Sequence, residues 1–215
     1  MKSAKDRIKE IIVILKKHYP YVKKTALDFS NPHEVLVATI LSAQCTDKRV
    51  NIVTKELFKK YKKVSDYAHA DLKKFEQEIR STGFYHNKAR NIIDSSKIIE
   101  NKYNGIVPDK MEELIELPGV ARKTANIVLG NGYGVVEGIA VDTHVKRLSF
   151  RLGLSKNTDP VKIEKDLMLL VSKSDWFDIS NLLIEHGRNV CKAQKPDCIN
   201  CFLANICPKL GVLGN

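Results

Sequence analysis

Apolar side chains recur at intervals of three and four residues along most of this chain. The first set is Ile8, Ile11, Ile12 and Leu15, a spacing that places apolar side chains on one face of a helix. Similar stripes follow at Leu72, Phe75 and Ile79, at Ala89, Ile92, Ile93 and Ile99, and at Ile163, Leu167, Leu170 and Val171. We find no convincing two-residue alternation of the kind typical of strands. The spacing therefore predicts an all-α fold of about ten helices with short connections.

Residues that favour helix N-termini stand between these stripes. They are Asn31 before Pro32, Asp47 before Lys48, Asp109 after Pro108, and Asp142 before Thr143. Residues 35–44, VLVATILSAQ, are apolar on nearly every side, so we expect them to pass through the centre of a helical bundle. The glycine-rich residues 129–138 indicate a break between two helical groups.

The composition points to a polyanionic partner. The chain has 215 residues and a formal charge of +11, with 43% hydrophobic and 28% charged residues. This is enough apolar material for a real core, and the excess of positive charge attracts nucleic acid or anionic lipid. The longest uncharged stretches, 35–46 and 124–136, are shorter than the roughly 20 residues of a membrane span. The N-terminus lacks the apolar run of a secretory signal, so we expect no membrane and a cytoplasmic location.

Residues 116–126, ELPGVARKTAN, predict a tight helical hairpin. One helix is expected to end at Leu117 and another to begin near Arg122, joined by a Pro-Gly turn. Such a turn exposes N–H groups that bind phosphate, and Arg122 adds a side-chain donor. Lys123 lies at the helix start, where the dipole disfavours a cation, and an amine without its extra proton is a nucleophile. The spacing fits equally well with Lys123 as one more phosphate contact.

Four of the five cysteines lie within 17 residues of each other and predict a metal or cluster site. Their spacing is C-x6-C-x2-C-x5-C, formed by Cys191, Cys198, Cys201 and Cys207. An odd count in a cytosolic chain argues against a disulfide framework. The residues leave zinc and iron–sulfur as the choices, although zinc ribbons usually carry two C-x2-C pairs and only one is present here. Cys45 stands apart and is expected to be a small buried hydrophobe.

The hairpin motif L-P-G-V-x-R-K-T-A resembles the helix-hairpin-helix of the endonuclease III family of DNA glycosylases. The segments ILSAQCTDKRVN, GFYHNKARNI, NGIVPD and AVDTHVKRL and the clustered cysteines follow the family's order, from about Phe29 to Cys207. The resemblance implies two helical lobes with a DNA-binding cleft between them. Residues 26–135 would form a six-helix barrel with the hairpin, and residues 1–25 and 136–215 an iron–sulfur lobe. It also implies one [4Fe–4S] cluster on the four cysteines.

The same resemblance implies that Lys123 is the catalytic nucleophile and Asp142 the essential aspartate. Taken alone, Asp142 is typical of an N-cap, and capping and catalysis can coexist. In the implied reaction Lys123 attacks C1′ of a flipped nucleotide, forms a Schiff base, and allows β-elimination. Asp142 would stabilise positive charge on the sugar and help to deprotonate Lys123, which it would face across the cleft. His144 in the same helical turn is more typical of a capping or packing residue.

The resemblance also implies contacts with DNA. Gln44 would enter the duplex opposite the flipped nucleotide and Phe84 would act as a second wedge. The alternatives are a water-facing glutamine at a helix end and a core phenylalanine. Further contacts are expected at Leu117, Gly119, Ala121, Arg122, Lys192 and Lys195. Ala121 departs from the glycine of many relatives and Asp197 from a more basic cluster loop, and for both lysines an ordinary solvated charge pair stays open.

The resemblance therefore implies a bifunctional enzyme of base excision repair, a DNA glycosylase and abasic-site lyase. It would act as a monomer, associated with the nucleoid, on double-stranded DNA that carries an oxidised pyrimidine or an abasic site. One alternative is a monofunctional mismatch or adenine glycosylase, which typically lacks a lysine at the position of Lys123. The other is a non-catalytic helix-hairpin-helix protein, which would give Lys123 and Asp142 no joint purpose.

Overall fold

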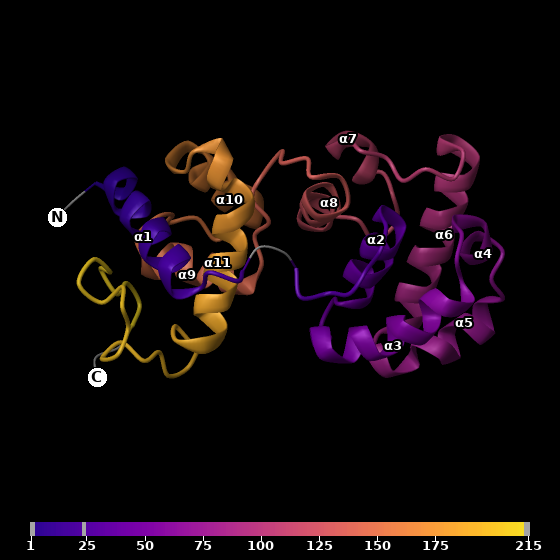
Figure 1. The fold of residues 1–215 in the computed structure, drawn as a ribbon, viewed down its shortest axis with the longest axis horizontal. Coiled ribbons are helices and arrows are strands. Elements are labelled where there is room, and N and C mark those ends of the chain that lie inside the picture. Colours follow the sequence, from indigo (N-terminus) through magenta and orange to yellow (C-terminus); the bar gives the residue numbers. More distant parts are fainter. Residues whose placement is uncertain (1–2, 23–24, 213–215) are drawn as a thin grey trace. The chain divides into compact units, whose positions relative to one another are not determined.

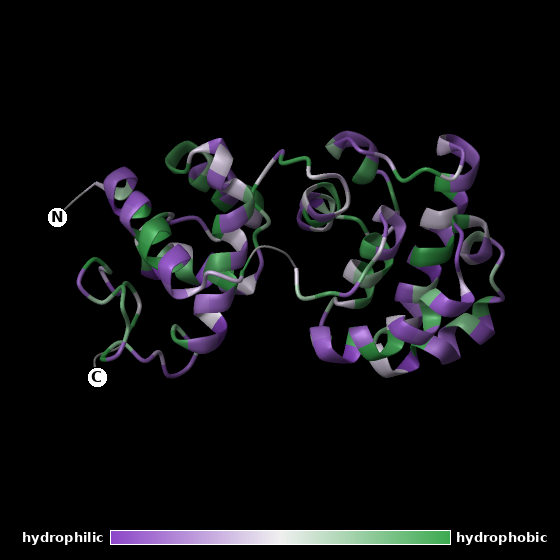
Figure 2. Cartoon of the chain, in the orientation of Figure 1, coloured by the Kyte–Doolittle hydropathy of each residue, from purple (hydrophilic) through white to green (hydrophobic). Residues whose placement is uncertain are grey.

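The computed structural model describes residues 3–22 and 25–212, and all regular structure in these ranges is helical. The all-α prediction is confirmed, with eleven α-helices in the described ranges where about ten were expected. The chain divides into two compact units (Figure 1), unit 1 from residues 1–24 and 138–215 and unit 2 from residues 25–137. These boundaries differ by one or two residues from those expected in the sequence. Figure 2 shows the hydrophobic faces of the helices turned toward the core of each unit.

Unit 2 is built around a buried central helix. Its α-helices are α2 (Pro32–Leu41), α3 (Asp47–Lys60), α4 (Val64–Ala68), α5 (Leu72–Ile79), α6 (Tyr85–Tyr103), α7 (Met111–Leu114) and α8 (Arg122–Val128). Helix α2 packs against α3, α6 and α8, and His33 and every side chain from Val35 to Leu41 are buried. The Asn31 side chain caps this helix by accepting the Glu34 amide at 2.9 Å, as its position before Pro32 predicts. The helix therefore passes through the core, as its apolar sequence predicts.

Unit 1 combines the N-terminal helix with the C-terminal third of the chain. Its α-helices are α1 (Ala4–His18), α9 (Thr143–Arg151), α10 (Pro160–Leu170) and α11 (Trp176–Asn189). The predicted stripe on α1 is buried against α10 and α11, which explains why helices so distant in sequence form one core. The segment 190–212 follows α11 and contains no regular helix. It carries the four clustered cysteines.

Several helix ends differ from the sequence predictions. Thr46, and not Asp47, caps α3 through its hydroxyl, and α7 begins at Met111 after Lys110 instead of at Asp109. Helix α7 also ends at Leu114, three residues before the predicted Leu117. Residues 129–138 do not end helix α8 abruptly, because Leu129–Tyr133 continue it as a π-helical turn. Gly134 then takes a left-handed conformation.

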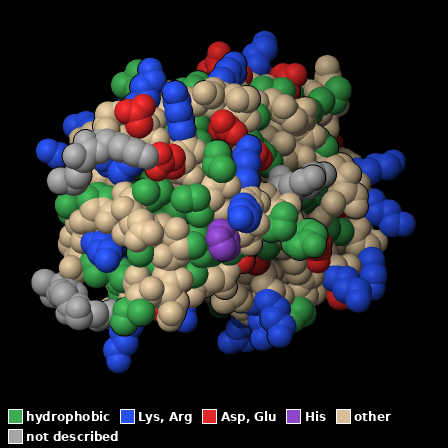
Figure 3. Space-filling model, turned by 60° about the vertical axis from the view of Figure 1, so that its left-hand side comes forward, with side chains coloured by type: hydrophobic (Ala, Val, Ile, Leu, Met, Phe, Trp, Pro, Cys, Tyr) green, Lys and Arg blue, Asp and Glu red, His purple; other side chains and the backbone are tan. Residues whose placement is uncertain are grey.

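The surface agrees with the basic composition. Lys and Arg side chains are prominent on the face shown in Figure 3, with acidic groups between them. No helix in the described part of the chain is both long and apolar enough to cross a membrane.

Candidate DNA-binding and catalytic site

The turn between α7 and α8 is fixed against helix α6. Leu117 N–H donates to the Leu114 carbonyl, and Val120 N–H donates to the Leu117 carbonyl, both at 3.1 Å. From α6, the Ser95 hydroxyl donates to the Pro118 carbonyl at 2.8 Å. Gly119 has φ +77°, and a Cβ there would lie 2.6 Å from Asn91 Nδ2. Glycine is therefore required at this position both by conformation and by space.

Lys123 is exposed in the first turn of α8, directly after this hairpin. Ala121 is the exposed N-cap residue and provides no side-chain cap, so the first amides of the helix have no intrahelical acceptor. Arg122 is half-buried. The side chain of Leu117 is only 2% exposed, so a DNA contact at this residue would have to use its backbone.

Gln44 and Phe84 line the same surface hollow, together with Gly119 and Thr124 of the hairpin. The hollow is wholly within unit 2 and has about 600 Å³ of empty space, including its open mouth. Gln44 lies beyond the end of α2 rather than on it, because the helix stops at Leu41. Phe84 is 64% exposed at the start of α6, so the alternative of a core residue is wrong.

Both of these residues have left-handed backbones, with φ of 53° at Gln44 and 50° at Phe84. Residues other than glycine, asparagine and aspartate rarely adopt the left-handed region of φ and ψ. The two turns therefore present exposed side chains on strained backbones beside the hairpin. Strain of this kind persists only where neighbouring structure holds it.

Asp142 is the N-cap of α9 in unit 1, as the sequence predicts. One carboxylate oxygen accepts the Val145 amide at 2.8 Å, and the side chain is half-buried. His144 contacts the Arg147 guanidinium through Nδ1 at 3.1 Å, and burial lowers its pKa. That packing agrees with leaving His144 out of the catalytic residues. Asp142 is thus a fixed carboxylate with one oxygen engaged in capping.

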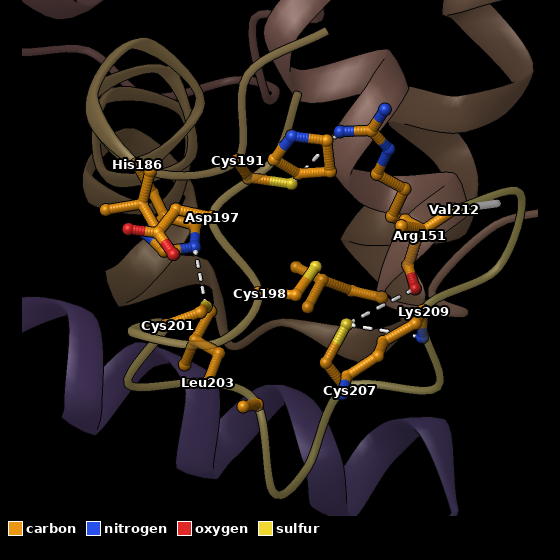
Figure 4. A pocket seen from close by; sticks show the side chains of 14 residues that line it. Arg151, His186, Cys191, Asp197, Cys198, Cys201, Leu203, Cys207, Lys209 and Val212 are labelled. Atoms are coloured by element: carbon orange, nitrogen blue, oxygen red, sulfur yellow. Dashed lines mark hydrogen bonds between the residues drawn. The ribbon is translucent and has the colours of Figure 1, made fainter. Parts of the chain in front are cut away.

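The four clustered cysteines line one cavity in unit 1 with about 390 Å³ of empty space (Figure 4). Polar groups contact the sulfur atoms of Cys191, Cys201 and Cys207. Arg151 Nη1 donates to Cys191 Sγ at 3.4 Å, and the Lys209 amide donates to Cys207 Sγ at 3.3 Å. His186 Nε2 lies 3.6 Å from Cys201 Sγ. N–H donors directed at sulfur stabilise thiolates, so this donor set fits a thiolate-bound metal centre.

The thiols are held together without disulfides, and all five cysteines are free. Burial raises the pKa of Cys201 and of Cys207, and the neighbouring cysteines raise both further. A bound metal cation would favour the thiolate forms of Cys201 and Cys207 against this effect. In the described ranges, no three His, Cys, Asp or Glu side chains form a group that could hold a single metal ion. Cys45 is half-buried against the core of unit 2 and takes no part in this site.

Two arginines of α9 hold the cysteine loop, and sequence reasoning missed both. Arg147 donates to the Cys191 carbonyl at 3.0 and 3.2 Å, and Arg151 donates to the Lys192 carbonyl at 2.7 Å. Their positions at i and i+4 on the helix that Asp142 caps were the available signal. Lys192 and Lys195 have exposed side chains. Asp197 accepts the Asn200 amide at 3.2 Å, which makes it a turn residue of the loop.

The described residues thus combine a helical fold, a tight helix-hairpin-helix turn and a cavity lined by four thiols. Residues 37–173 match the family model described as HhH-GPD superfamily base excision DNA repair protein. The chain is 53% identical over 208 residues to an endonuclease III of Synechocystis sp., covering 97% of this chain and 94% of the relative. The chain belongs to this superfamily and, within it, to the endonuclease III family, which confirms the resemblance found in the sequence.

Further relatives agree with this assignment. An endonuclease III of Bacillus subtilis is 51% identical over 179 residues, which are 83% of this chain and 81% of that protein. The fold is similar to the structure of a trapped endonuclease III–DNA covalent intermediate, with TM-score 0.91, 44% identity and 97% coverage of both chains. A thermostable thymine-DNA glycosylase with TM-score 0.85 is only 20% identical and shares the fold alone.

Proposed function

We propose that this protein is a bifunctional DNA glycosylase and abasic-site lyase of base excision repair. Its substrate is double-stranded DNA that carries an oxidised pyrimidine or an abasic site, and it acts as a monomer. The observation that carries this proposal is the exposed Lys123 directly after the hairpin, in a chain 44% identical to an enzyme trapped covalently on DNA. A monofunctional glycosylase would have no use for a lysine nucleophile at this point.

Lys123 is proposed as the nucleophile. Its neutral amine attacks C1′, and the bond between C1′ and the base breaks as the base leaves with the electron pair. Loss of a proton and opening of the sugar ring give a Schiff base between Lys123 and C1′. Removal of a proton from C2′ then breaks the C3′–O bond and nicks the strand. Water finally hydrolyses the Schiff base and regenerates the amine.

Asp142 is proposed as the catalytic carboxylate. Capping of α9 holds it rigidly, and only one of its oxygens needs to accept the Val145 amide. A fixed negative charge stabilises the positive charge that grows on the sugar as the base departs. The same carboxylate can accept a proton from the Lys123 ammonium. Lys123 belongs to unit 2 and Asp142 to unit 1.

The DNA contacts are proposed at three places in unit 2 and one in unit 1. Gln44 and Phe84 enter the duplex from strained turns beside the hairpin. Backbone N–H groups of Gly119 and Ala121 bind phosphate together with Arg122. The N–H of Leu117, the other contact expected in the hairpin, already donates to the Leu114 carbonyl. Lys192 and Lys195 on the exposed cysteine loop contribute phosphate contacts in unit 1.

We also propose that Cys191, Cys198, Cys201 and Cys207 hold one [4Fe–4S] cluster. The shared cavity, the free thiols and the N–H donors around the sulfurs support this assignment. When bound, the cluster would cross-link four points of the loop through iron–thiolate bonds. Its effect on repair is then structural, because it fixes the segment that carries Lys192 and Lys195.

Borohydride trapping on abasic DNA tests the proposed activity. The wild-type protein should form a covalent adduct, and Lys123→Ala should form none. Asp142→Asn keeps the cap, because asparagine caps as well as aspartate, but removes the charge. Its rate of base removal should fall by about 100- to 1000-fold with little change in melting temperature.

Arg122→Ala provides a matched control beside the nucleophile. It should weaken DNA binding and leave trapping at saturating DNA largely intact. An adduct that persists in Lys123→Ala would contradict the lyase assignment. Binding of abasic DNA without any adduct in the wild type would favour a non-catalytic DNA-binding protein, and base release without strand cleavage would favour a monofunctional glycosylase.

A further inference from the structure

Helix α6 carries a polar stripe that faces the loops of the proposed DNA-binding surface. Lys88, Asn91 and Ser95 are spaced by three and four residues and so share one face of the helix. Ser95 binds the Pro118 carbonyl and Asn91 packs against Gly119, so two members of the stripe hold the hairpin. Lys88 and Asn91 also line the hollow that Gln44 and Phe84 share. The stripe thus contacts the hairpin and lines the hollow beside the two other turns that are proposed to contact DNA.

Lys88 connects two of these turns directly. Its side chain is buried, with the residue only 4% exposed. The ammonium donates to the Leu41 carbonyl at 2.8 Å and to the Thr82 carbonyl at 2.9 Å. Leu41 is the last residue of α2, just before the Gln44 turn, and Thr82 is the last residue of the short helical turn before Phe84. One ammonium thus joins the starts of both turns.

The chemistry of these two acceptors explains why a cation occupies a buried position. The last carbonyls of a helix lack intrahelical donors and carry the negative end of its dipole. Leu41 ends an α-helix and Thr82 ends a 3-10 turn, so Lys88 satisfies two such carbonyls. Burial lowers the pKa of Lys88, because a buried ammonium loses its contact with water. Hydrogen bonds to the two carbonyls offset part of that loss. A methylene chain alone would leave both carbonyls without this donor.

The strained backbones beyond these carbonyls need such support. Gln44 and Phe84 both adopt left-handed conformations, which are strained in non-glycine residues. These turns project side chains into solvent, where few contacts of their own would hold them. A bond at the start of each turn restricts the directions that both side chains can take.

We propose that Lys88 is a positioning residue that sets the two duplex-entering turns in a fixed register with the hairpin. This inference rests on the proposed function, because it assumes that Gln44 and Phe84 enter the duplex. Lys88 itself does not touch DNA in this proposal. Its loss should impair the step in which a nucleotide leaves the stack, and should spare the chemistry at C1′. That step is needed for duplex substrates and not for an abasic site in a single strand.

Lys88→Met removes the ammonium and keeps most of the side-chain volume. The first measurement is the rate of borohydride trapping on the same abasic site in duplex and in single-stranded DNA. We expect the duplex rate to fall by about 10- to 100-fold, because small misplacements of substrate-positioning groups have effects of this size. The single-strand rate should keep most of its value. The readout is the trapping rate on duplex DNA divided by the trapping rate on single-stranded DNA.

A fluorescent base analogue, 2-aminopurine, placed opposite the abasic site provides a second measurement. Its fluorescence changes when wedge residues disturb the stack, so Lys88→Met should lose most of this change at saturating protein. Ile99→Ala is the matched control, since Ile99 is a fully buried core residue of the same helix. It should lower the melting temperature without changing either the rate ratio or the fluorescence signal.

Gln44→Ala and Phe84→Ala separate the failure of this inference from failure of the proposed function. If neither variant changes the ratio, the proposed wedge roles are wrong. If both lower the ratio but Lys88→Met behaves like Ile99→Ala, the positioning role of Lys88 is overturned. If Lys88→Met does not fold, Lys88→Gln replaces it, because glutamine keeps an N–H donor. Its ratio should lie between those expected for wild type and Lys88→Met. A Lys88→Gln ratio equal to that of wild type would also reject the proposal.

Discussion

His33 is a buried side chain of α2 whose ring nitrogen lies 3.0 Å from the Ser96 hydroxyl. Burial lowers its pKa to about 4, compared with about 6.5 in an unfolded chain. As the pH falls, His33 is protonated in the unfolded state before it is protonated in the folded state. The free energy of unfolding is therefore highest above pH 6.5 and falls between pH 6.5 and pH 4. The loss should be on the order of 3 kcal/mol.

Urea unfolding of wild type and His33→Gln at pH 7 and pH 4 measures this effect. The variant should be less stable at pH 7 but should lose less stability on acidification. Ser96→Ala is the control, because it removes the hydroxyl partner and keeps the titrating ring. Equal acid losses in wild type and His33→Gln would show that His33 is not the group that titrates.

The exposed positions of Gln44 and Phe84 could be predicted only in part from the sequence. The motifs identified both residues, but periodicity placed Gln44 on a helix and left Phe84 open between core and surface. The deciding facts are the left-handed turns and the end of α2 at Leu41. Lys88, which joins the starts of both turns, lies in the motif GFYHNKARNI, but the motif alone indicates no role for it. A buried lysine of this kind has no sequence signature, because its acceptors are backbone carbonyls, which every residue has, and Leu41 is distant in the chain.

At the scale of elements, α6 determines the position of the hairpin. Gly119 and Gly105 both have positive φ, +77° and +78°, so alanine at either position incurs similar backbone strain. Only Gly119 is also crowded, since its Cβ would lie 2.6 Å from Asn91 Nδ2, whereas nothing lies within 4 Å at Gly105. Gly105→Ala should lower the free energy of unfolding by about 1 kcal/mol, and Gly119→Ala by roughly 1–3 kcal/mol more.

Chemical denaturation of the two alanine variants gives this difference. The double variant Gly119→Ala with Asn91→Ala should recover most of the extra loss, because it removes the atom that the new Cβ meets. DNA affinity should fall for Gly119→Ala and remain unchanged for Gly105→Ala. If both single variants lose the same stability, close packing of α6 against the hairpin is not what requires glycine there.

Helix interiors followed from the sequence more reliably than helix ends. The stripes on α1 and α6 are fixed by burial of many side chains, so the periodicity of three and four residues was a sufficient signal. On α5, Phe75 and Ile79 are buried as predicted, but Leu72 at the helix start is 36% exposed. Ends depend on one or two hydrogen bonds. The Thr46 hydroxyl caps α3 although Asp47 offers equally suitable chemistry, and periodicity does not distinguish neighbouring caps.

At the scale of the whole molecule, each unit has its own hydrophobic core. That α1 joins the C-terminal third was implied by the family resemblance and not by periodicity, because packing between distant helices leaves no local pattern. Trp176, the only tryptophan of the chain, lies in unit 1 and donates to the Val171 carbonyl at 3.0 Å. Its fluorescence therefore reports the unfolding of unit 1 alone.

This reporter allows the structural effect of the proposed cluster to be measured. A metal centre on the 190–212 segment cross-links residues that have no regular helix to hold them, so its binding free energy stabilises unit 1. Cys198→Ala should abolish the visible absorption and lower the melting transition seen by Trp176. A loss of 2 kcal/mol corresponds to about 9 °C for a unit of this size. Hydrogen exchange of α2 amides, in the core of unit 2, should change little.

Cys45→Ala is the matched control for the loss of a thiol. Cys45 is half-buried in unit 2, so its removal should leave the absorption and the Trp176 transition unchanged. A colourless wild-type protein that contains zinc would reject the iron–sulfur assignment while keeping the cross-link argument. A coloured wild type whose Trp176 transition is unaffected by Cys198→Ala would show that the cluster does not stabilise unit 1. The structural role proposed for it would then have to be replaced by one in DNA contact or electron transfer.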